Sequence, residues 1–121
     1  MSAEAKLKAL NLKLPEMPAP IANYVRFRPA GELVFLSGQG PRRPDGTQAT
    51  GKVGRDVTWE EAYEHAKLTG LGLLAAMKQA ADGDLDRVEV VKVLGMVNAT
   101  PEFGDHPKVI NGCSDLFVAC L

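Results

Sequence analysis

Apolar residues cluster with strand-like spacing in two early parts of the chain. Residues 33–36 read LVFL, and this run of four apolar positions predicts a short buried strand. Polar and apolar residues alternate over residues 24–28, which predicts an edge strand with one wet face. Pro29 and Gly31 lie between the two segments and favour a turn, so we expect a hairpin.

A third strand is predicted over residues 88–98. Its two faces are both largely apolar: Val88, Val90, Leu94 and Met96 share one face, and Val91, Val93 and Val97 share the other. An antiparallel strand that is apolar on both faces needs cover on both. Helices can cover one face, and we expect another subunit to cover the other.

Helical spacing of apolar residues predicts a long helix over residues 59–81. Thr58 and Glu61 have the spacing of a capping box, in which each side chain satisfies a helix-start amide near the other residue. Gly70 and Gly72 lower the helix propensity by about 1 kcal/mol each. We expect them to let the helix lie close to a sheet.

A second long helix is predicted to begin after Asp105, with Pro107 in its first turn. The Asn111-Gly112 pair is unfavourable inside a helix, which suggests a specific contact there. The apolar stripe of this helix consists of Val109, Ile110, Cys113, Leu116, Phe117 and Cys120.

The first 20 residues are expected to form an arm. Ser2 can cap a short helix through about residue 10, and residues 14–20 contain three prolines that exclude helix and central strand. We therefore divide the chain into an N-terminal helix and proline-rich arm over residues 1–20 and one domain over residues 21–121. The element order predicts an α+β fold with a mixed sheet backed by two helices.

Composition narrows the functional classes. The chain has 121 residues, a net charge of −1 and no apolar run long enough for a membrane span, so we expect a cytoplasmic protein and consider nucleic acid an unlikely partner. His65 and His106 are distant in sequence, and we expect no metal and no cofactor. Cys113 and Cys120 would lie about 10.5 Å apart along one helix, so we expect buried thiols and no disulfide between them.

Ser37-Gly38-Gln39-Gly40-Pro41 is the stretch in which chemistry is most expected. It follows the LVFL run directly, its side chains bring a hydroxyl and an amide, and its glycines allow close approach of a ligand to the backbone. The same residues also fit a polar turn that merely caps a strand. Spacing alone does not separate these two interpretations.

A family resemblance favours the first interpretation, in which residues 37–41 form a ligand-binding site. Residues 24–39, YVRFRPAGELVFLSGQ, resemble the first hairpin of the RidA/YjgF family of reactive-intermediate deaminases, with the tyrosine and the Ser-Gly-Gln at the family's separation. The long helix, the strand near residues 88–98 and the segment F-x5-VIN at residues 103–111 continue the family's order. The resemblance implies a chorismate mutase-like trimer with ligand clefts between subunits.

The resemblance also implies an activity, the hydrolysis of enamines or imines such as 2-aminoacrylate to 2-keto acids and ammonia. Tyr24, Ser37, Gly38 and Asn111 stand where the family lines its cleft around a small carboxylate-bearing metabolite, and Ser37 would be the catalytic residue. Tyr24 also fits a tyrosine that packs on an edge strand, and Asn111 fits a helix residue that faces water.

The chain departs from the family after residue 121. Family members continue into a strand with an arginine that holds the substrate carboxylate and a last strand with a glutamate near the attacking water. These 121 residues lack both strands, and no arginine in them stands at a matching position. The alternative function is therefore a non-catalytic trimeric module that binds small metabolites.

Overall fold

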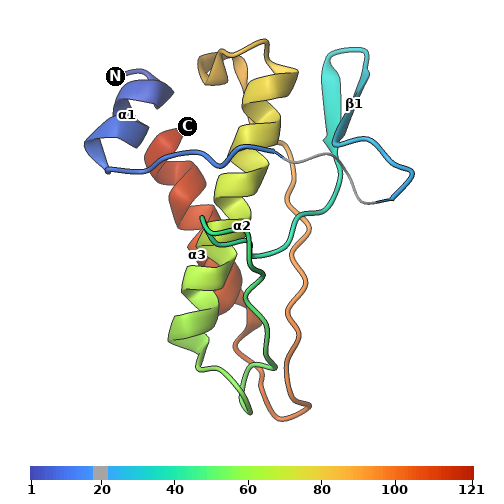
Figure 1. Cartoon of the computed structure of the whole chain (residues 1–121), viewed down its shortest axis with the longest axis vertical. Helices are drawn as coiled ribbons and strands as arrows, with labels where there is room; N and C mark the ends of the chain where they lie inside the picture. The colour runs from blue at the N-terminus through green and yellow to red at the C-terminus, as the bar shows by residue number, and fades with distance from the viewer. Residues whose placement is uncertain (18–21) are drawn as a thin grey trace.

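The computed structural model describes residues 1–17 and 22–121. The elements follow in the order α1 (Ala3–Ala9), β1 (Phe27–Ala30), β2 (Leu33–Leu36), α2 (Trp59–Ala80), the short 3₁₀ helix η1 (Leu85–Arg87) and α3 (His106–Cys120) (Figure 1). This order confirms the α+β class and all three helices expected from the sequence. Pro18, Pro20 and the expected boundary between residues 20 and 21 lie outside the described residues.

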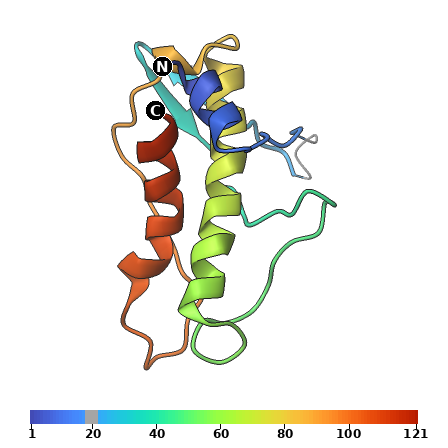
Figure 2. The ribbon, with the colours of Figure 1, turned by 90° about the vertical axis from the view of Figure 1, so that its left-hand side faces the viewer.

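Helices α2 and α3 lie side by side and run in the same direction (Figures 1 and 2). Two glycines make this close packing possible. A Cβ added at Gly112 would lie 1.9 Å from the carbonyl oxygen of Tyr63, and one added at Gly70 would lie 2.9 Å from Leu116 Cδ2. The expectation that Gly70 packs on a sheet is therefore wrong, because its neighbour is α3. The contact of Gly112 with the Tyr63 carbonyl oxygen explains why a glycine follows Asn111 inside the helix.

The core is formed mainly between these two helices and α1. Ala3 and Leu7 of α1 are almost completely buried against α3 and η1. The Ala3 amide donates to Asp86 Oδ1 at 2.8 Å, and the Ser2 hydroxyl accepts from the Ala5 amide at 3.1 Å as the expected cap. The buried members of this cluster are Ala3, Leu7, Leu74, Met77, Leu85, Cys113, Leu116, Phe117 and Cys120.

The starts of α2 and α3 differ in how their amides are satisfied. The capping box is confirmed, because Glu61 N donates to Thr58 Oγ1 at 3.1 Å and Thr58 N donates to Glu61 Oε1 at 3.2 Å. Asp105 is the N-cap of α3, but its side chain accepts no capping hydrogen bond. Pro107 compensates in part, since it lies in the first turn and has no amide to satisfy.

The hairpin has the expected second strand and a shifted first strand. Strand β1 pairs antiparallel with β2 from Phe27 opposite Leu36 to Ala30 opposite Leu33, and Gly31 has the positive φ of 62° that the tight turn needs. The expectation that β2 is buried is wrong: Phe35 is 62% exposed, and only Leu36 packs against the core. No other element of the described chain covers the rest of this strand.

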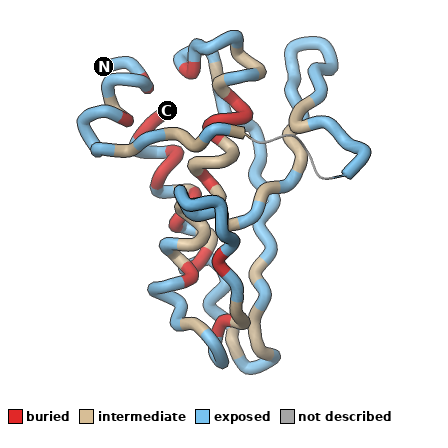
Figure 3. Tube along the Cα trace, viewed as in Figure 1, coloured by how far each residue is buried: buried red, intermediate tan, exposed pale blue. Residues whose placement is uncertain are grey.

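The predicted strand over residues 88–98 is an extended segment outside the two-stranded sheet. It runs back along the helix pair, opposite in direction to both long helices, with Gly95 against Ile110 of α3, and most of it is exposed (Figures 1 and 3). Its end is fixed, because Val53 N donates to Asn98 O at 2.9 Å. Val91, Leu94 and Met96 are each 78% exposed or more, so their expected cover does not come from residues 1–17 and 22–121.

None of the helices in the described part of the chain combines the length and apolarity that crossing a bilayer requires.

Substitution of Gly112 by alanine tests the helix contact. Alanine gains about 1 kcal/mol in helix propensity, but its Cβ meets a backbone oxygen that cannot move aside by a rotamer change. We expect Gly112→Ala to lower the free energy of unfolding by about 2 kcal/mol or more in urea titrations. Gly104→Ala is the control, since no atom lies within 4 Å of its added Cβ. Equal stability of the two variants would contradict the contact.

Candidate ligand-binding site

Ser37 is held at the end of β2 by two hydrogen bonds to the opposite strand segment. Its amide donates to Arg26 O at 2.8 Å, and its hydroxyl donates to Val25 O at 2.5 Å. The hydroxyl proton is therefore engaged within the hairpin. The lone pairs of Ser37 Oγ stay available, so this oxygen can accept a hydrogen bond from a ligand or a water molecule.

Ser37, Gly38 and Gln39 lie in an irregular segment after β2, called the Ser37 turn below, which is anchored on one side and open on the other. Gln39 lies against α2, since a Cβ added at Gly72 would be 3.6 Å from Gln39 Oε1. Around Gly38, by contrast, a Cβ would meet no atom within 4 Å. In residues 1–17 and 22–121, the amides of Gly38 and Gln39 donate to no protein acceptor. This open turn therefore offers two backbone donors and one hydroxyl acceptor in a small space.

Tyr24 and Asn111, the other expected ligand-binding residues, occupy different parts of the molecule. Tyr24 is 49% exposed and precedes Val25, the partner of the Ser37 hydroxyl, so Tyr24 and Ser37 belong to the same end of the hairpin. Asn111 is exposed on α3, next to Ile110, which packs on Gly95. Among the described residues no hydrogen bond joins Asn111 to the hairpin, so one chain brings two of these three residues together.

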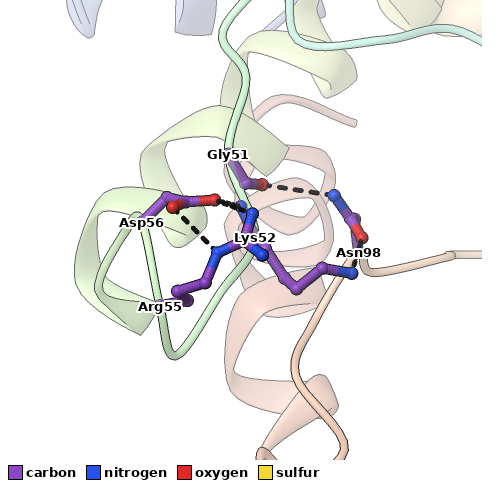
Figure 4. A network of polar contacts seen from close by, with 5 residues as sticks. All are labelled: Gly51, Lys52, Arg55, Asp56 and Asn98. Atoms are coloured by element: carbon purple, nitrogen blue, oxygen red, sulfur yellow. Dashed lines mark hydrogen bonds and ion pairs between the residues drawn. The ribbon is translucent and has the colours of Figure 1, made fainter.

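A second polar cluster links the loop before α2 to the end of the extended segment (Figure 4). Lys52 Nζ donates to Asn98 Oδ1 at 2.9 Å, and Asn98 Nδ2 donates to Gly51 O at 3.5 Å. Asp56 accepts from Lys52 N at 2.8 Å and pairs with Arg55 at 2.9 Å. Hydrogen bonds from Arg55 and from the Lys52 amide hold the pKa of Asp56 at about 2.

The sequence contains no signal for this cluster, because its members are separated by up to 47 positions and share no motif. Arg55 and Asp56 also border a hollow of about 420 Å³ at the start of α2. All of their side-chain hydrogen bonds are to each other or to neighbouring backbone. We therefore assign the cluster a structural role, the attachment of the extended segment to the loop before α2.

Ser37 lines neither of two hollows that the described residues form beside the helices. The first lies beside the start of α2, and the second, of about 380 Å³, lies between α1 and Lys78. The expectation that Ser37 lines the largest polar pocket concerns an assembly of several chains. It stays a prediction.

The two cysteines are buried and free, as expected. Burial raises the pKa of both thiols, which keeps Cys113 and Cys120 in the protonated form at neutral pH. Protonated, buried thiols are poor nucleophiles, so their role is packing within α3.

Comparisons with known proteins agree on a family. The model of the family described as "YjgF/chorismate mutase-like, putative endoribonuclease" matches residues 4–121. Protein TCP17 of Trypanosoma cruzi is 40% identical over 116 residues, which are 95% of this chain and 72% of that protein.

Two solved structures are also similar. One, described as a putative endoribonuclease from Shewanella oneidensis MR-1, has a TM-score of 0.88 at 33% identity and aligns with 99% of this chain over 80% of its own. The other is Atu1372 from Agrobacterium tumefaciens, of unknown function, with a TM-score of 0.88 at 40% identity over 98% of this chain and 74% of its own. The chain belongs to the RidA/YjgF family, and its fold is the YjgF-like α+β fold.

The depressed pKa of Asp56 predicts a stability change in acid. Asp56 ionises near pH 3.8 in an unfolded chain and near pH 2 in the folded one, so its contribution to stability is complete above about pH 4 and is lost as the pH falls toward 2. We expect the stability difference between wild type and Asp56→Asn to shrink over this range in unfolding experiments. The control is Asp82→Asn, at an exposed aspartate outside the cluster. A difference independent of pH would refute the assignment.

Proposed function

We propose that this chain, assembled with copies of itself, hydrolyses reactive enamines and imines such as 2-aminoacrylate to 2-keto acids and ammonia. The observation that carries the proposal is the open turn of Ser37, Gly38 and Gln39, with unused amides and free hydroxyl lone pairs. The resemblance of residues 24–39 to the first hairpin of the RidA/YjgF deaminases implies the same reaction class, whereas the description of the matching family model names a putative endoribonuclease.

The reaction requires few functional groups from the protein. 2-Aminoacrylate tautomerises to its imine, water adds to the imine carbon, and cleavage of the C–N bond releases ammonia and leaves pyruvate. The protein must hold the carboxylate, exclude competing orientations and place a water molecule beside the imine carbon. In this proposal Ser37 Oγ accepts a hydrogen bond from that water, and the Gly38 amide donates to the ligand.

Tyr24 and Asn111 complete the proposed site. Tyr24 contacts one side of the planar substrate, because this residue is 49% exposed and precedes Val25, the partner of the Ser37 hydroxyl. Asn111 orients the ligand from a neighbouring chain, since among the described residues no hydrogen bond joins Asn111 to the hairpin. Carboxamide and phenol groups suit a small polar metabolite, and neither requires a metal or an organic cofactor.

Self-association into a homotrimer is part of the proposal. Phe35, Val91, Leu94 and Met96 are more than half exposed and lie on extended segments that the helices do not cover. Exposed apolar surface of this kind marks interaction sites in soluble proteins. A cleft between two chains would bring a hairpin turn from one chain toward α3 of another.

One observation favours a second candidate, a non-catalytic module that binds small carboxylates. The Ser37 hydroxyl donates its proton to Val25 O, so it is an acceptor and not a proton donor to a ligand in this arrangement. A binding module predicts stabilisation by 2-keto acids without turnover. A ligand at 100 times its dissociation constant adds about 2.7 kcal/mol to the native state, which a thermal shift detects.

The proposed role of Ser37 predicts a loss of activity in Ser37→Ala. We expect ammonia release from freshly generated 2-aminoacrylate to fall about tenfold or more, because the attacking water loses its acceptor. Ser114→Ala is the matched control, at a serine of α3 away from the hairpin. Rates are to be measured after subtraction of spontaneous hydrolysis.

Equal rates in wild type and Ser37→Ala would remove Ser37 from the site. A wild-type rate no faster than spontaneous hydrolysis, together with a thermal shift by pyruvate, would favour the binding module.

A further inference from the structure

The hollow of about 380 Å³ between α1 and the end of α2 has no residue in common with the Ser37 turn. The two helices lie beside each other there (Figure 2), and an ion pair of 2.5 Å between Lys78 and Glu4, which both line the hollow, ties them together. The volume lies in the lower part of the range for small-molecule sites. This hollow, called the α1 hollow below, is therefore large enough for a small ligand.

Positive charge dominates the lining of the α1 hollow. Three of its residues are lysines, Lys8, Lys13 and Lys78, and its one carboxylate, Glu4, is paired with Lys78. No ion pair within residues 1–17 and 22–121 involves Lys8 or Lys13. Two positive charges of the lining are therefore left uncompensated by the described chain.

Helix capping does not account for Lys8 and Lys13. A lysine near a helix C-terminus can hydrogen-bond to the last carbonyl groups. At the end of α1, however, the backbone amides of residues 10–12 already donate to the carbonyl oxygens of residues 6–8 at 2.9–3.0 Å. Asn11 has the positive φ of 55° that closes a helix end in this way. The two ammonium groups are therefore not needed as caps and are available to a ligand.

The other residues of the lining supply an amide and an apolar side. Asn11 is exposed, and the side-chain hydrogen bonds within residues 1–17 are those of Ser2 and Lys6, so the Asn11 carboxamide has no partner in the described chain. Leu12 and Leu14 are partly buried against the core. An anion held by the lysines would thus have a further hydrogen-bond donor and apolar carbon atoms beside it.

We propose that the α1 hollow binds a phosphate monoester with an apolar group next to the phosphate. Such an ester has about 1.5 to 2 negative charges at neutral pH, which matches the two uncompensated lysines. Lysine binds phosphate as a point charge, Asn11 donates to a further phosphate oxygen, and Leu12 and Leu14 contact the apolar group. Free metabolites and lipid headgroups both present this chemistry. The site is separate from the Ser37 turn, so it does not depend on the proposed function.

The test compares butyl phosphate, inorganic phosphate and butanol in NMR chemical-shift titrations at about pH 7.5, where the ester is largely dianionic. We expect butyl phosphate to shift the amides of residues 7–14 and to bind about tenfold more tightly than inorganic phosphate, because part of its alkyl chain is buried. Butanol should cause no saturable shift. Lys8→Gln and Lys13→Gln should each lower the affinity about tenfold, through loss of one hydrogen bond to a charged group.

Lys92→Gln is the control, at an exposed lysine of the extended segment, and should leave the affinity unchanged. Lys8 and Lys13 are exposed as well, so their substitution should not disturb folding. Equal affinity of wild type, Lys8→Gln and Lys13→Gln, an equal loss in Lys92→Gln, or no shifts in residues 7–14 would overturn the proposal.

Sedimentation with phosphatidylcholine vesicles, with and without phosphatidic acid, distinguishes the two sources of the ester. Retention on the phosphatidic acid vesicles that Lys8→Gln weakens would support the site and identify a lipid headgroup. Binding of butyl phosphate without retention on either vesicle would support the site and identify a free metabolite.

Discussion

The contact between the Tyr63 carbonyl oxygen and Gly112 sets the geometry of the whole chain. Gly112 has no side chain, so α3 can lie directly against the backbone of α2. Gly70, about two helical turns after Tyr63 in α2, allows a second close approach, to Cys113 and Leu116 of α3. Because the two helices are parallel, the chain must run back between the end of α2 and the start of α3, and residues 88–98 do so as an extended segment with Gly95 against Ile110 of α3 (Figures 1 and 2). The hairpin is positioned by α2, through Leu36 and Gln39.

Burial is divided unevenly as a result. Most of the buried side chains belong to the helices, whereas the hairpin and residues 88–98 keep apolar side chains at the surface (Figure 3). The Ser37 turn lies at the base of this exposed hairpin and has donors that no group of the described chain uses. In the proposed function, a site at this turn gains its walls from the subunit that covers the extended segments, so we expect ligand binding and association to depend on the same surface.

The helices were predictable because their signals are local. The capping box at Thr58, the three- and four-residue spacing in α2 and α3, and the proline after Asp105 each lie within a few positions. The burial of β2 and the pairing of residues 88–98 depend on residues that are distant in sequence. Apolar side chains indicate that these segments must be covered, but they do not identify the covering element. For the same reason, the sequence does not show that Gly70 packs against α3 and not against a sheet. The α1 hollow carries no local signal at all, since Lys78 joins Lys8 and Lys13 only in three dimensions.

The central claim is that the Ser37 turn is a carboxylate site completed by a second chain. A crystal structure of the assembled protein with pyruvate bound tests it most directly. The account predicts that pyruvate lies in a cleft between two chains, with its carboxylate on the Gly38 amide of one chain and Asn111 of the other chain in the wall. A Ser37 turn that faces open solvent, away from every neighbouring chain and without pyruvate, would contradict it.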